Sequence, residues 1–140
     1  MASINSLQEK YEDLGKRFQS SRNGVIDSSL LMAFDYEYQG QDAEVVIATR
    51  EFTAVCPWTN LPDFGTLTVT YVPKQYCIEL KSFKYYLSSF TGVGIVQEHA
   101  ANRILTDLFQ CCQPGWMEIT LDYNTRGGLH TTDKVRREDT

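Results

Sequence analysis

Residues 65–72 read Gly-Thr-Leu-Thr-Val-Thr-Tyr-Val, and this is the stretch that most clearly decides the fold. Threonine alternates with apolar side chains along it, which is typical of a β-strand with one buried face. Pro73 ends the pattern. A second β-rich run begins at Ala43 and leads to Cys56, so we expect two neighbouring strands at the start of the core.

Two helical patterns follow these strands. Residues 79–90 place large apolar side chains on one helical face, and residues 97–112 form a second amphipathic pattern that Pro114-Gly115 ends. Two more strands are predicted over Trp116–Tyr123 and residues 129–135, joined by a hairpin turn. The order β-β-α-α-β-β predicts an α+β fold, an antiparallel four-stranded sheet with two helices on one face.

Length and composition fit one small globular domain. The chain has 140 residues, of which 42% are hydrophobic, and a net charge of −5, which disfavours general nucleic-acid binding. We expect an N-terminal arm over residues 1–42 and the catalytic domain over residues 43–140. No run is apolar enough to span a bilayer and the start does not resemble a signal peptide, so we expect a cytoplasmic protein.

A four-stranded sheet of this kind leaves two edge strands open. Open edges invite pairing with another chain, and two helices cover only one face of the sheet. We therefore expect the subunit to associate with copies of itself into a closed ring.

Cys56 and Asp63 are the candidate catalytic residues. Cys56 lies at a predicted strand end in Cys-Pro-Trp-Thr-Asn-Leu-Pro-Asp, seven residues before Asp63. A thiolate can attack an electrophilic carbon, and a carboxyl group can move a proton to or from the resulting adduct. On this stretch alone, a cysteine packed as a small hydrophobic residue is the commoner outcome.

Four segments of the sequence form a recognisable set. They are Cys-Pro-x-Thr-x-x-Pro-Asp-Phe at 56–64, Glu-Leu-Lys-Ser-Phe-Lys-Tyr-Tyr at 79–86, Gln-Glu-His-x-x-Asn at 97–102 and Arg-Gly-Gly at 126–128. Together they resemble the NADPH-dependent 7-cyano-7-deazaguanine reductases, the nitrile reductases of the queuosine pathway, and the segment at 79–86 is the most specific of them. The resemblance runs from about Ala43 to Val135.

The resemblance implies a tunnelling fold, in which ββααββ subunits close into a barrel and two rings stack into a decamer. It implies active sites between subunits and a four-electron reduction of the nitrile to an aminomethyl group with two molecules of NADPH. Cys56 would form a covalent thioimide with the nitrile carbon, and Asp63 would protonate the nitrogen.

The resemblance also implies residues that bind the ligands. Glu98 would accept paired hydrogen bonds from the guanine-like edge, although a carboxylate that caps a helix is the simpler reading of this residue alone. Many relatives have histidine where this chain has Gln97. Substrate would also contact the stretch Ile78, Glu79 and Leu80, and the cofactor would contact Lys81, Ser82 and Tyr86.

Cofactor phosphates need side-chain cations here. Gly92-Val93-Gly94 lacks the third glycine and the βαβ setting of a dinucleotide-binding loop, so lysine or Arg126 is the chemically sensible partner. A cyclohydrolase of the same fold would need a zinc site that these residues do not supply, and we expect no metal. An amidinotransferase-type relative that acts on nitrile-bearing transfer RNA, and a non-catalytic base-binding protein, remain the alternatives.

Overall fold

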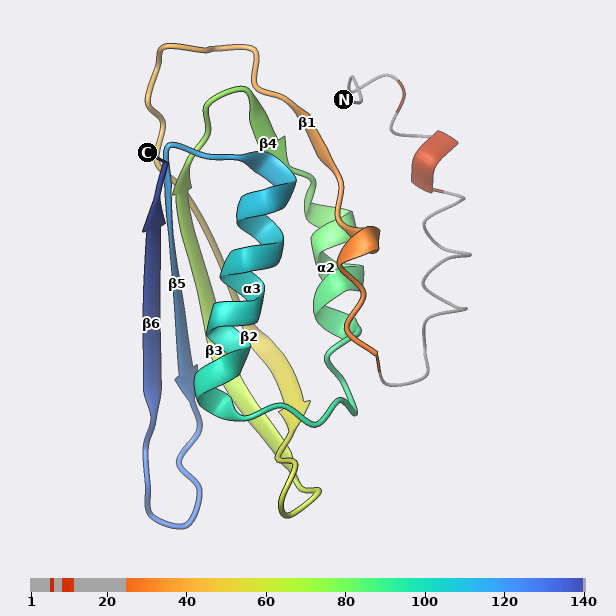
Figure 1. The fold of residues 1–140 in the computed structure, drawn as a ribbon, viewed down its shortest axis with the longest axis vertical. Helices are drawn as coiled ribbons and strands as arrows, with labels where there is room; N and C mark the ends of the chain where they lie inside the picture. The colour runs from red at the N-terminus through yellow and green to blue at the C-terminus, as the bar shows by residue number, and fades with distance from the viewer. Residues whose placement is uncertain (1–5, 7–8, 12–24, 140) are drawn as a thin grey trace.

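The computed structural model describes residues 6, 9–11 and 25–139, and the expected order of strands and helices is present (Figure 1). Four long strands and two helices form the α+β unit predicted from the sequence. The elements are η2 (Ser28–Leu30), β1 (Ala33–Asp35), β2 (Val45–Val55), β3 (Pro62–Val72), β4 (Tyr76–Ile78), α2 (Leu80–Ser88), α3 (Gln97–Cys112), β5 (Trp116–Tyr123) and β6 (Thr132–Glu138).

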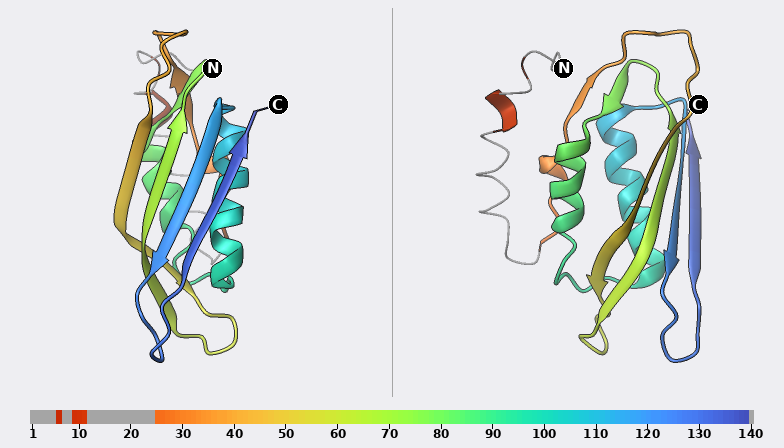
Figure 2. Two further views of the ribbon diagram at one scale, coloured as in Figure 1. Left: turned by 90° about the vertical axis from the view of Figure 1, so that its left-hand side faces the viewer. Right: turned by 180° about the vertical axis from the view of Figure 1, so that it is seen from behind.

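The main sheet is antiparallel throughout, in the order β2-β3-β5-β6, which leaves β2 and β6 as its edges. Both helices lie on one face of this sheet, as the side view in Figure 2 shows. The β2–β3 ladder shifts register between Thr49 and Phe52, a bulge that bends β2 near its middle. No helix among the described residues is long and apolar enough to cross a membrane.

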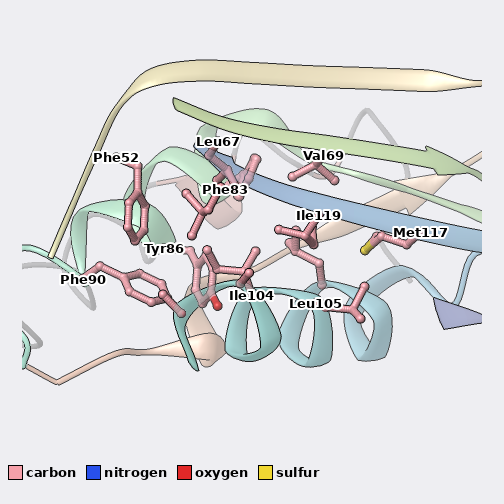
Figure 3. Packing of buried hydrophobic residues seen from close by; sticks show 14 of the residues in the cluster. Phe52, Leu67, Val69, Phe83, Tyr86, Phe90, Ile104, Leu105, Met117 and Ile119 are labelled. Carbon is pink, nitrogen blue, oxygen red and sulfur yellow. The ribbon is translucent and has the colours of Figure 1, made fainter. Parts of the chain in front are cut away.

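The core lies between the sheet and the helices. Leu67 and Val69 project from β3 toward Ile104 of α3 (Figure 3). The alternating Thr66, Thr68 and Thr70 lie on the other face and are only partly buried. The alternation in residues 65–72 therefore becomes a division between a packed face and an open face. Burial of large apolar side chains is worth about 1.5–3 kcal/mol each, so this face holds the layers together.

Local sequence sets the ends of the helices. The buried Glu79 side chain accepts hydrogen bonds from the backbone N–H groups of Lys81 and Ser82, which caps the start of α2. At the end of α3, Gln113 has a φ of 47° and Pro114 follows, so the helix stops there.

Three features differ from the sequence-based expectations. The last strand spans Thr132–Glu138 rather than residues 129–135, because the turn before it is longer than a tight hairpin. A short sheet formed by β1 and β4 was not predicted. Leu80, an apolar residue within the helical pattern of residues 79–90, is 55% exposed. Much of the N-terminal arm expected over residues 1–42 lies outside the described residues, and the division at residue 42 stays a prediction.

Candidate active site

Cys56 lies directly after β2, inside a short closed loop. Its backbone N–H donates to the Leu61 carbonyl and its carbonyl accepts from the Asn60 N–H, both at 2.9 Å. Asn60 takes a left-handed φ of 59°, a conformation that asparagine tolerates better than most residues. The loop leaves Cys56 only 5% exposed, so its sulfur is held in one place at the end of the strand.

The segment before α3 fixes the same end of β2. The Val55 N–H donates to the Val93 carbonyl at 2.9 Å, and the Ile95 N–H donates to the Val55 carbonyl at 3.0 Å. This bridge brings the start of α3 to the end of the molecule that carries the β2–β3 loop (Figure 1). Gln97 and Glu98 are the first two residues of α3, so they approach the Cys56 end from another element.

Asp63 pairs with Arg126. Asp63 lies opposite Ala54 on the β2–β3 ladder and is buried, and its Oδ1 accepts a hydrogen bond from Arg126 Nη1 at 2.6 Å. Arg126 comes from the β5–β6 loop, which Arg126 and Leu129 close by two backbone hydrogen bonds of 3.0 Å. Gly127 and Gly128 both have positive φ in this turn, which explains the two glycines after Arg126.

The surroundings of Cys56 favour its thiolate form. Hydrogen bonds from the Thr59 side chain, and then from the backbone at Thr59 and Trp58, lower the pKa of the Cys56 thiol from 9.0 to about 7, with a smaller contribution from Arg126. In contrast, burial raises the pKa of Cys77, and it raises that of Cys111 to about 11. Cys56 is therefore suited to nucleophilic chemistry near neutral pH.

Glu98 is exposed in the first turn of α3, and Gln97 is half-buried. The Gln97 carbonyl accepts a hydrogen bond from the buried Tyr123 hydroxyl at 3.2 Å, which ties the start of α3 to the end of β5. The helix start thus presents the Glu98 carboxylate at the surface, where a ligand can reach it.

The predicted substrate stretch lies elsewhere in the subunit. Ile78 and Glu79 are buried, Leu80 is exposed, and Figure 1 places the start of α2 away from the β2–β3 loop. One chain therefore brings Cys56 and Asp63 together but does not bring them to residues 78–80.

The predicted cofactor residues differ in exposure: one is at the surface and two are buried. Lys81 is exposed, with its Nζ 4.5 Å from the centre of the Tyr11 ring. Ser82 and Tyr86 are fully buried and already engaged: Ser82 Oγ donates to the Glu79 carbonyl at 2.8 Å, and the Tyr86 hydroxyl donates to Asp107 Oδ2 at 2.7 Å.

Two features of the site were missed by reasoning from the sequence. Thr59 has the largest effect on the Cys56 thiol, and its position three residues after the cysteine was an available signal. The Arg126–Asp63 pair had no such signal, because a separation of 63 residues is closed only by the fold.

Comparison with known proteins gives a consistent result. A family model described as QueF-like protein matches residues 62–140. A relative from Caldicellulosiruptor bescii, named NADPH-dependent 7-cyano-7-deazaguanine reductase, is 45% identical over 94% of this chain and 99% of its own length. This chain belongs to that reductase family.

Other reductases of this family are equally similar. One from Chlorobaculum tepidum is 48% identical over 79% of this chain and 94% of its own length. Among solved structures, the apo form of an archaeosine synthase QueF-Like aligns with a TM-score of 0.64 over 69% of this chain and 95% of that one. Its 22% identity shows a shared fold only. The fold expected from the sequence, the tunnelling fold, is thus confirmed for the subunit.

Proposed function

We propose that this protein reduces the nitrile of 7-cyano-7-deazaguanine to the aminomethyl group of 7-aminomethyl-7-deazaguanine, with NADPH, in queuosine biosynthesis. The observation that carries the proposal is 45% identity over 94% of the chain to a reductase of that name. The Cys56 thiol, whose pKa is lowered to about 7 beside the Asp63–Arg126 pair, supports it with suitable chemistry.

Cys56 would act as the nucleophile. Its sulfur adds to the nitrile carbon, one π bond of the C≡N group breaks, and the electron pair moves to nitrogen to give a thioimide. Asp63, as the carboxylate that faces Arg126, can take the thiol proton and deliver it to that nitrogen. The addition is then balanced, because the proton lost by sulfur is the proton gained by nitrogen.

NADPH, when bound, supplies a hydride at each of two stages, since four electrons separate a nitrile from an amine. Cys56 holds the carbon for the first stage. Once that carbon has received the first hydride, its C–S bond breaks, sulfur recovers the electron pair as thiolate, and an imine remains. In the second stage the imine carbon would receive the second hydride and the nitrogen a further proton from solvent. A sulfur with a pKa near 7 suits both roles, because it is a good nucleophile and also a good leaving group.

Glu98 would read the base. Its exposed carboxylate can accept two hydrogen bonds from the adjacent N–H groups of the guanine-like edge. Gln97, the half-buried neighbour, and the backbone of residues 78–80 would complete the substrate contacts. Since one chain separates residues 78–80 from Cys56, those contacts would come from a second copy.

The cofactor residues fit in part. Lys81 is an exposed cation able to hold a phosphate, whereas the Ser82 and Tyr86 side chains are used inside the subunit. We propose that Lys81 makes the phosphate contact and that Ser82 and Tyr86 shape the helix that presents it. Arg126 would contact the cofactor only at the Cys56 end, where it also pairs with Asp63.

The two open edges of the sheet and the separation of residues 78–80 from Cys56 favour a closed homo-oligomer. A decamer is its expected size. The expected location is the cytoplasm. Light scattering of the purified protein tests the assembly. An active monomer would contradict a site shared between copies.

The activity test is incubation with 7-cyano-7-deazaguanine and NADPH, followed by cofactor absorbance and by mass spectrometry of the base. We expect two molecules of NADPH consumed per aminomethyl product. Parallel reactions that contain nitrile-bearing transfer RNA and ammonia, without NADPH, test the amidinotransferase alternative. Conversion there, with no NADPH oxidation in the first reaction, would overturn the proposal.

A further inference from the structure

Asp133 is an acidic residue that the proposed mechanism does not use. It lies on β6 directly opposite Leu121 of β5, and directly opposite residues project to the same face of a sheet. Leu121 is fully buried in the core, and Val135, two residues after Asp133, packs against the same core. Asp133 therefore projects toward the helix side, where α3 packs on β5 and β6.

The Asp133 carboxyl group has an unusual bonding state. Its Oδ2 is the one buried side-chain oxygen or nitrogen without a hydrogen-bond partner among the residues that the structure describes. A buried acceptor without a donor costs on the order of 1–3 kcal/mol. Such an atom calls for an explanation in a functional partner or a change of protonation.

Electrostatic interactions link Asp133 to other titratable groups at the Cys56 end. Burial, and then the charge of Glu98, raise the pKa of the Asp133 carboxyl. Burial also raises the pKa of the Tyr123 phenol, and the negative charges of Asp133, Asp63 and Glu98 raise it further. Glu98 of α3 and Tyr123 of β5 therefore lie within electrostatic range of Asp133, at the end of the sheet where the Tyr123 hydroxyl donates to the Gln97 carbonyl.

On β6 itself, the neighbouring Lys134 lies opposite Thr120, so it projects to the other face of the sheet. Its Nζ lies 3.8 Å from Glu118 Oε1. No ion pair of the described residues engages Asp133. The charge that raises the pKa of its carboxyl is the like charge of Glu98.

We propose that Asp133 is a positioning residue for Glu98: in its neutral form its O–H donates to the Glu98 carboxylate and holds that carboxylate toward the bound base. This inference rests on the proposed function. The shared proton gives the buried oxygen a partner and leaves the negative charge on Glu98, where the N–H groups of the base need it. Two carboxyl groups that lie close together can share one proton, because the like charge of each disfavours ionisation of both.

The test uses substrate binding without chemistry. In a Cys56→Ala background, calorimetry measures the affinity for 7-cyano-7-deazaguanine from about pH 4, near the ordinary pKa of an aspartate carboxyl, to about pH 8. The pKa of the Asp133 carboxyl is raised above that ordinary value. Asp133→Asn mimics the neutral carboxyl because its amide also donates. Asp133→Leu keeps the approximate size but removes the donor. Asp122→Asn, one residue along β5 from Leu121, is the matched control because Asp122 is exposed on the other face of the sheet.

We expect the Asn variant to bind with unaltered strength at the low end of the range and to remain nearly constant as pH rises. The parent protein should lose affinity as pH rises, because Asp133 then loses its proton. The Leu variant should bind roughly tenfold more weakly throughout, the loss of one hydrogen bond to a charged group. Asp122→Asn should follow the parent.

Equal losses in the Asn and Leu variants, or identical pH profiles for Asn and the parent, would overturn the positioning role. A loss of assembly by light scattering in Asp133→Asn would also overturn it, since it would show that the carboxylate pairs with a cation of another copy. If the parent itself does not bind the base, the proposed function fails. If the parent binds the base and every Asp133 variant binds it equally well, the positioning role of Asp133 is wrong and the proposed function still stands.

Discussion

Arg126 Nη1 donates to Asp63 Oδ1 at 2.6 Å, and this pair joins the β5–β6 loop to the strand that follows the Cys56 loop. Asp63 is buried whereas the Arg126 side chain is 42% exposed, so the pair anchors a surface loop on an interior carboxylate. Two loops that are distant in sequence, the Cys56 loop and the β5–β6 loop, therefore determine the charge near the Cys56 sulfur. Variants of either loop should change the reactivity of Cys56.

Arg126→Ala should weaken both stability and thiol activation. It leaves the buried Asp63 carboxylate without its cation, a loss of about 1–3 kcal/mol by urea denaturation. It should also move the pH midpoint of Cys56 alkylation upward from about 7, because the remaining negative charge disfavours the thiolate. Arg136→Ala is the control, since Arg136 pairs with the exposed Glu138. Equal effects of the two variants would contradict the assigned role of Arg126.

Thr59→Val should raise the pKa of the Cys56 thiol, because the Thr59 side chain makes the largest contribution to lowering it. The lowered value of about 7 means that alkylation in the parent protein speeds up as pH rises through 7 and falls away below it. In the variant the same rise should occur at a higher pH. Iodoacetamide labelling measured by peptide mass gives both curves, and superimposable curves would count against Thr59.

Substrate without NADPH should form a covalent adduct on Cys56. The thiolate can add to the nitrile before any reduction, so intact-protein mass spectrometry should show one added substrate mass per chain. Cys56→Ala should show none, and Cys77→Ala serves as the matched control because the raised pKa of Cys77 keeps that thiol protonated. An adduct of equal yield on Cys56→Ala would refute covalent catalysis at this residue.

Glu98→Ala should separate base recognition from thiol chemistry. Loss of a charge-assisted pair of hydrogen bonds should weaken substrate binding by about 1.5–3 kcal/mol per bond. The rate of Cys56 alkylation by a small reagent should stay unaltered, since that reagent does not use the base. Glu138→Ala, an exposed glutamate on the last strand, provides the comparison. Normal substrate affinity in Glu98→Ala would assign base recognition to other residues.

The strands and helices were predictable because local patterns determine them. Alternation of threonine with apolar residues gave β3 its buried face, and the spacing of apolar residues gave both helices. The predicted ends of an element were wrong where tertiary contacts outweigh the local preference of the sequence. The last strand spans Thr132–Glu138 because the turn before it is longer than a tight hairpin, and β5 then pairs with the charged residues that follow.

The arrangement of the site could not be predicted from the sequence. The roles of Cys56 as nucleophile and Asp63 as proton carrier stay predictions, and the fold places both residues near Arg126. The assignments of Ser82 and Tyr86 remain predictions, and their buried hydrogen bonds could not be seen in a sequence. Burial and partners over long separations depend on the whole fold, as the orphaned oxygen of Asp133 also does.

The lowered pKa of Cys56 carries a chemical liability. Peroxides react with thiolates rather than thiols, so an oxidant should convert Cys56 to its sulfenic acid well before it attacks Cys111 or Cys112, whose pKa values are raised by burial. Only 5% of Cys56 is exposed, and a base seated over the sulfur would cover what remains. Occupancy by substrate should therefore protect the enzyme from inactivation in air, and a preparation kept without it should depend on added reductant.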